Sequence, residues 1–178
     1  IKGFPWDLWG KNANDDNGHG THVAGTIAAK NNGGGVIGVA PGTKIYAVKV
    51  LDRNGSGTWS QVICGIDWVT ANSASLNIKV ANLSLGGTST SSVEVSAIDY
   101  AAAHGVLVVT AAGNDFAAGN PTMYPAALVQ PLGSDGVGGK GLAVGASDPS
   151  GERAAFSSTG TYISVSYTHL TLPTTSRV

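Results

Sequence analysis

Residues 80–110 read Val-Ala-Asn-Leu-Ser-Leu-Gly-Gly-Thr-Ser-Thr-Ser-Ser-Val-Glu-Val-Ser-Ala-Ile-Asp-Tyr-Ala-Ala-Ala-His-Gly-Val-Leu-Val-Val-Thr. This stretch predicts a complete strand–helix–strand unit. Its two ends, residues 80–85 and 106–110, are short apolar runs rich in valine and leucine, which predict strands. Residues 92–104 between them have the pattern of a helix, and Gly105 predicts a left-handed C-terminal cap. Two strands joined by a helix are typical of a parallel pair.

The same alternation continues in both directions along the chain. Residues 44–51 and 141–145 predict two more strands, and residues 19–29 and 58–72 predict two more helices. Such apolar strands are covered on both faces. The sequence therefore predicts an α/β fold, a three-layer sandwich around a mostly parallel central sheet. We expect residues 114–140, rich in glycine, proline and alanine, to form a functional surface loop without regular structure.

Composition limits the classes of partner. The 178 residues fit one domain, 42% are hydrophobic and only 12% are charged, with a formal net charge of −1. We therefore expect neither nucleic acid nor a membrane as a partner, because there is no basic surface and no apolar run long enough to cross a bilayer. The single cysteine, Cys64, excludes a disulfide within the chain, and its helical neighbours predict that it is a small buried side chain.

The most specific segment for chemistry is Asp-Asn-Gly-His-Gly-Thr-His-Val-Ala-Gly-Thr, residues 16–26. Glycines on both sides of His19 leave its imidazole open to a substrate, so we predict that His19 is a general base. Close to a helix N-terminus the imidazolium is disfavoured, and such a base normally needs a carboxylate behind it. Asp15 and Asp16 are interpreted as solvated loop carboxylates, with tuning of the cleft as the alternative, and both are poor candidates for the carboxylate of the triad.

Residues 16–26 resemble the histidine motif of the subtilisin-like serine proteases, the subtilases. The resemblance covers nearly everything between Asp15 and Ser166, and we interpret residues 1–166 as part of a catalytic domain of that family, truncated at both ends. It continues through Gly38-Val39-Ala40-Pro41, Ala47-Val48-Lys49-Val50-Leu51, Gly55-Ser56-Gly57, Asn82-Leu83-Ser84-Leu85-Gly86-Gly87, Ala111-Ala112-Gly113-Asn114 and Ala155-Phe156-Ser157-Ser158-Thr159-Gly160.

The resemblance implies the residues of a serine endopeptidase site. His19 matches the family's general base and Asn114 matches the side-chain donor of its oxyanion hole. Polypeptides would be the substrates, cleaved with a broad, apolar bias, and a propeptide or a protein inhibitor is a possible further partner. The family also implies a secreted monomer. The positions that match the family's substrate-binding residues are Ser56, Gly57, Trp59, Val62, Ser84, Leu85, Gly86, Ala112 and Gly113.

Only the family resemblance indicates a bound metal ion. No cofactor is required for the chemistry, but the turn at residues 31–35 matches a loop that wraps structural calcium in the family, with Asn32 as the candidate ligand. The other interpretation is a flexible glycine turn. A metal-dependent hydrolase using His19 and His22 is disfavoured, because the spacing of zinc-protease histidines and their glutamate is absent. We interpret His22 and His104 as structural.

The family pattern breaks at both ends. Asp7 lies too close to His19 to be the triad aspartate, and Ser176 lacks the Gly-Thr-Ser-Met-Ala surroundings of the nucleophile, so neither is assigned. We expect both triad partners outside this chain. From residue 167 onward the resemblance stops, and we interpret residues 167–178 as an artefactual tail similar to translated vector sequence. The alternative function is a catalytically inactive fragment that at most binds extended peptides.

Overall fold

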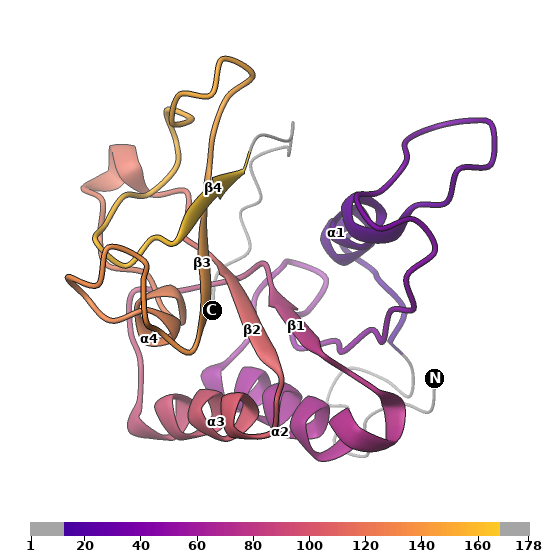
Figure 1. The fold of residues 1–178 in the computed structure, drawn as a ribbon, viewed down its shortest axis with the longest axis horizontal. Coiled ribbons are helices and arrows are strands. Elements are labelled where there is room, and N and C mark those ends of the chain that lie inside the picture. Colours follow the sequence, from indigo (N-terminus) through magenta and orange to yellow (C-terminus); the bar gives the residue numbers. More distant parts are fainter. Residues whose placement is uncertain (1–12, 168–178) are drawn as a thin grey trace.

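A parallel four-stranded sheet is the centre of the computed structural model, which describes residues 13–167 (Figure 1). The strands are β1 (Val80–Leu83), β2 (Leu107–Ala111), β3 (Gly141–Ala146) and β4 (Val165–Tyr167), in the spatial order β1-β2-β3-β4. All three pairings are parallel. The α/β class and the parallel sheet are thus confirmed.

The strand–helix–strand unit forms as its sequence predicts. Helix α3 (Ser92–Ala103) connects β1 to β2, and the Ser91 side chain caps it by accepting the Glu94 N–H at 3.2 Å. At the other end Gly105 adopts a φ of 74°, the left-handed conformation expected of it. Helix α2 (Trp59–Leu76) begins with a complete capping box of Thr58 and Gln61. Both predicted helices are confirmed to within a few residues.

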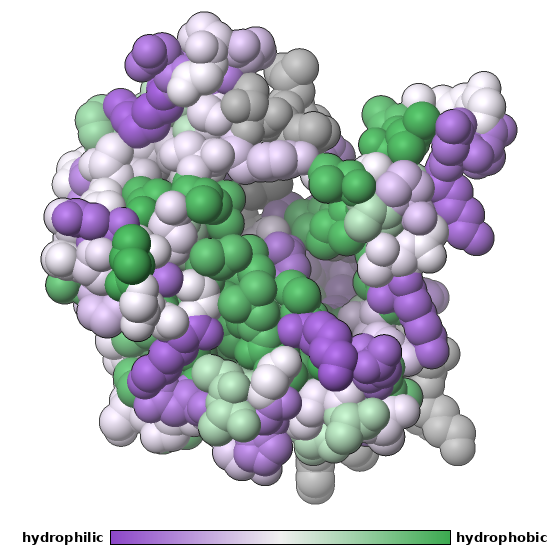
Figure 2. Space-filling view, viewed as in Figure 1, coloured by the Kyte–Doolittle hydropathy of each residue, from purple (hydrophilic) through white to green (hydrophobic). Residues whose placement is uncertain are grey.

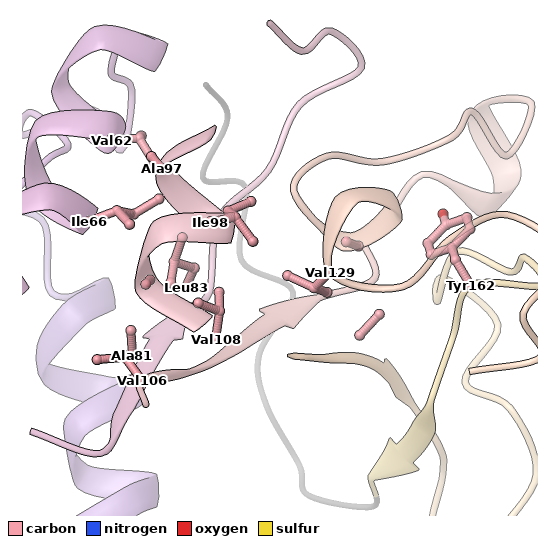
Figure 3. Close-up of a cluster of buried hydrophobic side chains, with 13 residues drawn as sticks. Val62, Ile66, Ala81, Leu83, Ala97, Ile98, Val106, Val108, Val129 and Tyr162 are labelled. Atoms are coloured by element: carbon pink, nitrogen blue, oxygen red, sulfur yellow. The ribbon is translucent and has the colours of Figure 1, made fainter. Parts of the chain in front are cut away.

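The hydrophobic core lies between the sheet and the helices that cover it (Figure 3). Ile98 of α3, Val108 of β2 and Ala143 of β3 are fully buried, and α3 packs against α2 on its far side. The short helix α4 (Ala126–Val129) packs on β2 and β3 and contributes the buried Val129. Helix α1 (His19–Ala28) stands apart from the sheet and contains no buried residue (Figure 1).

The strand predicted at residues 44–51 is not present. The segment packs against α2, since a Cβ added at Gly65 would come within 2.7 Å of Val50 Cγ1. The valines of this segment are thus spaced to pack on a helix, but a strand also needs a hydrogen-bonded neighbour, and none pairs with these residues in the described part of the chain. Within residues 13–167, β1 is an edge strand.

Residues 114–140 were expected to be an irregular surface loop, and this is wrong in part. They contain the 3₁₀ helix η1 (Phe116–Ala118) and α4, and Ala126 and Val129 are fully buried. Gly87 and Tyr124 also form an isolated antiparallel bridge. The run Ala-Ala-Leu-Val is too short to show a helical period, so composition alone concealed it. Strand β4 was not predicted either, and its last residue, Tyr167, is the first residue of the predicted tail.

The prediction that Cys64 is buried is wrong, because its side chain is exposed. The buried positions of α2 include Val62, Ile66, Thr70 and Ser73, which recur every three or four residues. At about 100° per residue, Cys64 lies roughly 200° around the helix from Val62, on the opposite face. Neighbouring apolar residues in a helix do not share a face unless their spacing matches its period.

Glu94, in the first turn of α3, is a carboxyl group inside the core with 0% of its surface exposed. Thr90 Oγ1 donates a hydrogen bond to its Oε2 at 2.8 Å, while Oε1 has no partner among the described residues. Burial raises the pKa of Glu94 above its ordinary value of 4.5, against the lowering effects of the Thr90 and Ser91 hydrogen bonds. Ionisation of Glu94 therefore destabilises the folded state.

Replacing Glu94 with glutamine should remove a pH-dependent loss of stability. Because the folded pKa is raised, the native state binds the proton more tightly, so the free energy of unfolding falls as pH rises above about 4.5. Each pKa unit of that shift costs about 1.4 kcal/mol at neutral pH. Urea unfolding at pH 4.5 and pH 7 measures this slope. The exposed Glu152 is the matched control: Glu152→Gln should keep the slope and Glu94→Gln should flatten it, whereas equal slopes would contradict the expectation.

Candidate active site

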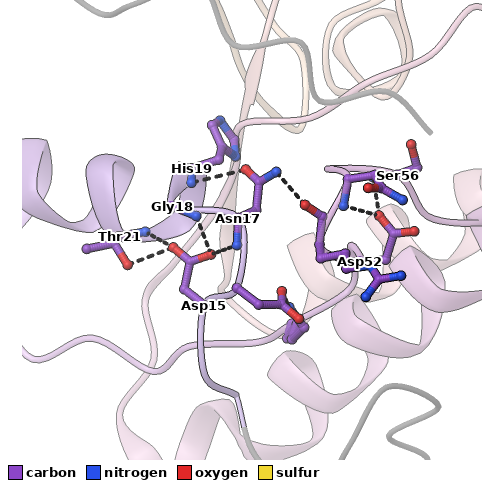
Figure 4. A network of polar contacts seen from close by, with 11 residues as sticks. Asp15, Asn17, Gly18, His19, Thr21, Asp52 and Ser56 are labelled. Carbon is purple, nitrogen blue, oxygen red and sulfur yellow. Dashed lines mark hydrogen bonds and ion pairs between the residues drawn. The ribbon is translucent and has the colours of Figure 1, made fainter.

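The turn before α1 presents His19 and is held by hydrogen bonds (Figure 4). Gly18 is the N-cap, with a φ of 98° that favours glycine, and it has no side chain to cap the helix. The His19 N–H donates to Asn17 Oδ1 at 3.3 Å, and Asn17 Nδ2 donates to the Arg53 carbonyl at 2.9 Å. This second bond connects the histidine turn to the turn that carries Ser56.

The Ser56 turn is ordered by its own carboxylate. Asp52 Oδ1 accepts the N–H groups of Asn54 and Ser56 at 2.8 and 2.9 Å. The next residue, Gly57, lies against the chain, since a Cβ there would come within 2.4 Å of the Val50 carbonyl oxygen. Glycine is required at this position by close packing alone. Ser56 itself is exposed and lies beside the histidine turn (Figure 4).

The imidazole of His19 is half-buried, and its Nε2 is buried without a hydrogen-bond partner among the described residues. Burial is the main cause that lowers the pKa of His19 below 6.5, the nearby His22 lowers it further, and the Asp15 carboxylate raises it. The sequence predicted the disfavoured charged form but attributed it to the helix N-terminus. The lowered pKa of His19 favours the neutral imidazole, the form that can accept a proton as a general base.

The carboxyl edge of the sheet carries the other predicted residues. Ser84, Leu85 and Gly86 follow β1 directly, and the segment 112–114 follows β2. Because β1 and β2 are parallel neighbours, these two segments leave the same edge of the sheet. Asn114 is exposed there, whereas Ala112 is 1% exposed.

Gly113 sits in a constrained part of that edge. Its φ is 104°, a Cβ there would come within 2.7 Å of Met123 Cγ, and its carbonyl accepts the Ser158 N–H at 3.0 Å. Ser158 Oγ in turn accepts the Asp115 N–H at 3.1 Å. The backbone on both sides of Asn114 is thus held by neighbouring segments, which is what a fixed amide donor requires.

A cleft of about 1030 Å³ lies between α1, residues 43–52, α2 and β1. Apolar side chains gather on both sides of this hollow (Figure 2). Of the predicted site residues, the cleft brings together His19, Val62, Ser84 and Leu85. Val62 is 2% exposed and belongs mainly to the core. The predicted residues that do not line the cleft are Ser56, Gly57, Trp59, Gly86, Ala112, Gly113 and Asn114.

Trp59 extends the predicted substrate surface at the start of α2. The indole is half-buried, and its Nε1 donates to Ser89 Oγ at 3.2 Å. This bond connects α2 to the loop that follows Gly86 and Gly87. The two edges of the predicted substrate site are therefore joined by a side-chain contact.

The candidate calcium turn offers a poor set of ligands by itself. Asn32 is exposed, and residues 31–35 supply only side-chain amide and backbone oxygens, whereas Ca²⁺ takes six to eight oxygens and favours carboxylates. The described residues contain no group of three or more His, Cys, Asp or Glu side chains that could hold a metal ion. The calcium site stays a prediction.

Asp15 has a larger structural role than the sequence interpretation gave it. It is exposed, as expected of a solvated loop carboxylate, but both of its oxygens also accept hydrogen bonds from the histidine turn (Figure 4). The signal was available, since an aspartate three residues before a glycine N-cap, with threonine at the third helical position, can replace the absent cap. Asp7 and Ser176 lie outside the described residues.

Comparison with solved structures identifies the class of fold. The structure matches the psychrophilic subtilisin-like protease Apa1 of Pseudoalteromonas sp. AS-11 with a TM-score of 0.66 and 34% identity, over 82% of this chain and 30% of that one. The fold is therefore subtilisin-like. The chain belongs to the subtilase family, whose model matches residues 7–173. That match ends inside the segment interpreted as a tail, and the origin of residues 167–178 stays a prediction.

Similar proteins of the family include two proteases of bacilli. The chain is 48% identical over 153 residues to subtilisin DY of Bacillus licheniformis, covering 85% of this chain and 51% of that protein. It is 49% identical over 152 residues to a thermostable alkaline protease of Halalkalibacterium halodurans, covering 85% and 38%. The chain thus spans about half or less of these relatives. Among the described residues, no helix combines the length and apolarity needed to cross a membrane.

Proposed function

We propose that this chain is part of a serine endopeptidase in which His19 is the general base. The observation that carries the proposal is the buried, unpartnered Nε2 of a neutral His19, located in the same cleft as Ser84 and Leu85. Membership of the subtilase family supports it. The serine nucleophile and the triad aspartate would be supplied by parts of the protein outside the described residues.

The chemistry follows from these positions. His19 Nε2 takes the proton of the serine hydroxyl as its oxygen attacks the peptide carbonyl, and the imidazolium then gives that proton to the leaving amine. The Asn114 amide donates a hydrogen bond to the oxygen of the tetrahedral intermediate, where negative charge develops. Water repeats the sequence in reverse on the acyl-enzyme and releases the second product.

We propose an extended polypeptide as the substrate. Segments 56–57 and 84–86 would pair with its backbone on either side, a mode that gives affinity with little demand on sequence. Leu85 and Trp59 give the site an apolar bias. Secretion, a propeptide and a protein inhibitor as partners, and a monomeric state are proposed on the family resemblance. A structural calcium at the Asn32 turn is proposed on the same ground, and calorimetric titration with CaCl₂ tests it.

The alternative is that this chain alone is a catalytically inactive fragment. A fluorophosphonate probe phosphonylates an activated serine, whose oxygen displaces fluoride from phosphorus, and it separates the two cases when it is added to the chain and to the full-length gene product. Labelling of the full-length protein alone supports both the proposed function and the inactivity of the fragment. Labelling of the chain at Ser176 would show that our interpretation of the tail is wrong, and no labelling of either would refute the proposed protease.

A further inference from the structure

We propose that Asp15 is a positioning residue for His19: its carboxylate replaces the missing helix-cap side chain and fixes the turn from which the imidazole projects. The catalytic meaning of this role rests on the proposed function of His19 as a base. The role itself is structural and electrostatic, so it can be measured without any catalytic activity.

The contacts of Asp15 enclose the histidine on both sides (Figure 4). Oδ1 accepts the N–H groups of Asn17 and Gly18 at 3.0 and 2.8 Å. Oδ2 accepts the N–H and the hydroxyl of Thr21 at 2.8 and 2.6 Å. In the sequence, His19 lies between the donors Gly18 and Thr21. The four bonds thus hold the backbone immediately before and after it.

Asn17 Oδ1 also holds this turn by accepting the His19 N–H at 3.3 Å, but the Asp15 carboxylate bonds the turn on both sides of His19. The N-cap, Gly18, has no side chain, and α1 has no buried residue, so packing restrains the helix only weakly. Asp16 is bonded to Lys49 Nζ at 2.5 Å. Thr21 N–H is one of the first-turn donors that a helix leaves unsatisfied, and the Asp15 carboxylate satisfies it from outside the helix. Asp15 is therefore a local restraint on the direction of His19, and it acts together with Asn17.

Asp15 also acts on the charge of the imidazole. Its hydrogen bonds, above all that from the Thr21 hydroxyl, hold the pKa of Asp15 far below the ordinary range, so it is ionised at any pH at which His19 titrates. The anion favours the imidazolium, while burial and His22 oppose it. Among residues 13–167, the other charged groups around this turn are the Lys49–Asp16 ion pair and, across the Asn17–Arg53 bond, Asp52 and Arg53.

Asp148 provides a matched control within the same chain. Its Oδ1 accepts the N–H and the hydroxyl of Ser150 at 2.9 and 2.6 Å and the Glu152 N–H at 3.1 Å. The local pattern of a carboxylate that bonds a following turn is therefore the same, but that turn carries no histidine. A general effect of removing a turn carboxylate should therefore appear when either Asp15 or Asp148 is replaced. A specific effect on His19 should appear only when Asp15 is replaced.

The test is an NMR titration of the His19 ring in the chain and in its Asp15→Asn and Asp148→Asn variants. Asparagine keeps an acceptor for the Asn17 and Gly18 N–H groups but loses the charge and cannot accept from Thr21. We expect Asp15→Asn to lower the His19 pKa by about 0.5 unit, the size of a screened interaction between neighbouring charges. Asp148→Asn should change it by less than about 0.1 unit, because Asp148 bonds a different turn and salt screens the interaction between separate exposed charges.

Amide exchange in the same samples tests the geometric part. The Thr21 amide should exchange at least about tenfold faster in Asp15→Asn, since its only acceptor outside the helix is lost. An unchanged His19 pKa, or an equal change in both variants, would overturn the proposal. If Asp15→Asn does not fold, Thr21→Ala decides: it removes only the hydroxyl bond, and a Gly18 amide that exchanges no faster would overturn it.

These outcomes are independent of the proposed function. A shifted His19 pKa together with a full-length protein that the fluorophosphonate does not label would leave Asp15 as the positioning residue of a non-catalytic histidine. A labelled full-length protein together with an unchanged His19 pKa would support the protease and refute the role of Asp15 in it.

Discussion

Changing His19 to alanine in the full-length protein is expected to lower kcat by about 10⁶, the size of the loss seen when the histidine is removed from subtilisin itself. The reason is that no other base in the described structure has a buried, unpartnered nitrogen. Without it the serine hydroxyl must lose its proton to water, and the leaving amine has no acid. Single-turnover hydrolysis of a peptide ester measures the loss of chemistry apart from binding.

Two other histidines serve as controls for that variant. His22 is exposed in α1, one turn after His19, and His104 Nδ1 donates to the Tyr100 carbonyl at 2.8 Å at the end of α3. We expect His22→Ala and His104→Ala to change kcat by less than about tenfold, since neither has a role in proton transfer. A loss in His22→Ala as large as that in His19→Ala would instead favour a metal-binding pair.

Changing Asn114 to leucine should lower kcat by about 10² to 10³ while KM stays nearly constant, as for the corresponding asparagine of subtilisin. Leucine has a similar volume but no amide donor, so the substrate carbonyl still binds and only the developing oxyanion loses its hydrogen bond. The neighbouring backbone is held through Ser158, so the variant should keep its fold. Steady-state kinetics on a peptide amide separates the two parameters.

Asn120 is the matched control for Asn114, because it lies in the same loop and has a structural task. Its Nδ2 donates to the Thr159 hydroxyl at 2.7 Å and its Oδ1 accepts the Thr159 N–H at 2.8 Å. Asn120→Ala should therefore lower the melting temperature without lowering kcat of the folded enzyme. If Asn114→Leu lowers the melting temperature as much as Asn120→Ala does, and its loss of kcat follows from that loss of fold, the oxyanion role is refuted.

The elements that depend on local signals were predictable. The strand–helix–strand unit at residues 80–110 contains Gly105, which was predicted to end the helix and has the positive φ expected of it. Its N-cap, Ser91, lies within the same unit but was not named in advance. The strand predicted at residues 44–51 depended instead on a partner distant in sequence, which no local pattern contains. Cys64 was misplaced because adjacency was weighed above helical spacing, and α4 was missed because a single turn has no period.

The candidate site also combines features that the local sequence predicts with features that depend on the folded structure. His19 was singled out because glycines flank it in a specific motif, but its Nε2 is buried in the structure and has no hydrogen-bond partner among the described residues. Its pKa moves in the predicted direction, but the main cause is burial, which depends on the cleft formed by α1, α2 and β1. The bonds of Asp15 depend on a backbone path with a left-handed Gly18, and such a path is fixed only when the turn folds.

The edge of β1 that does not face β2 affects how this chain behaves in solution. Val80 is 52% exposed on a strand that borders the apolar cleft, and no strand covers that side within residues 13–167. Unpaired backbone groups beside apolar surface attract strands of other molecules, so collisions between copies are the hazard. Aggregation of the chain in solution should therefore increase steeply with protein concentration.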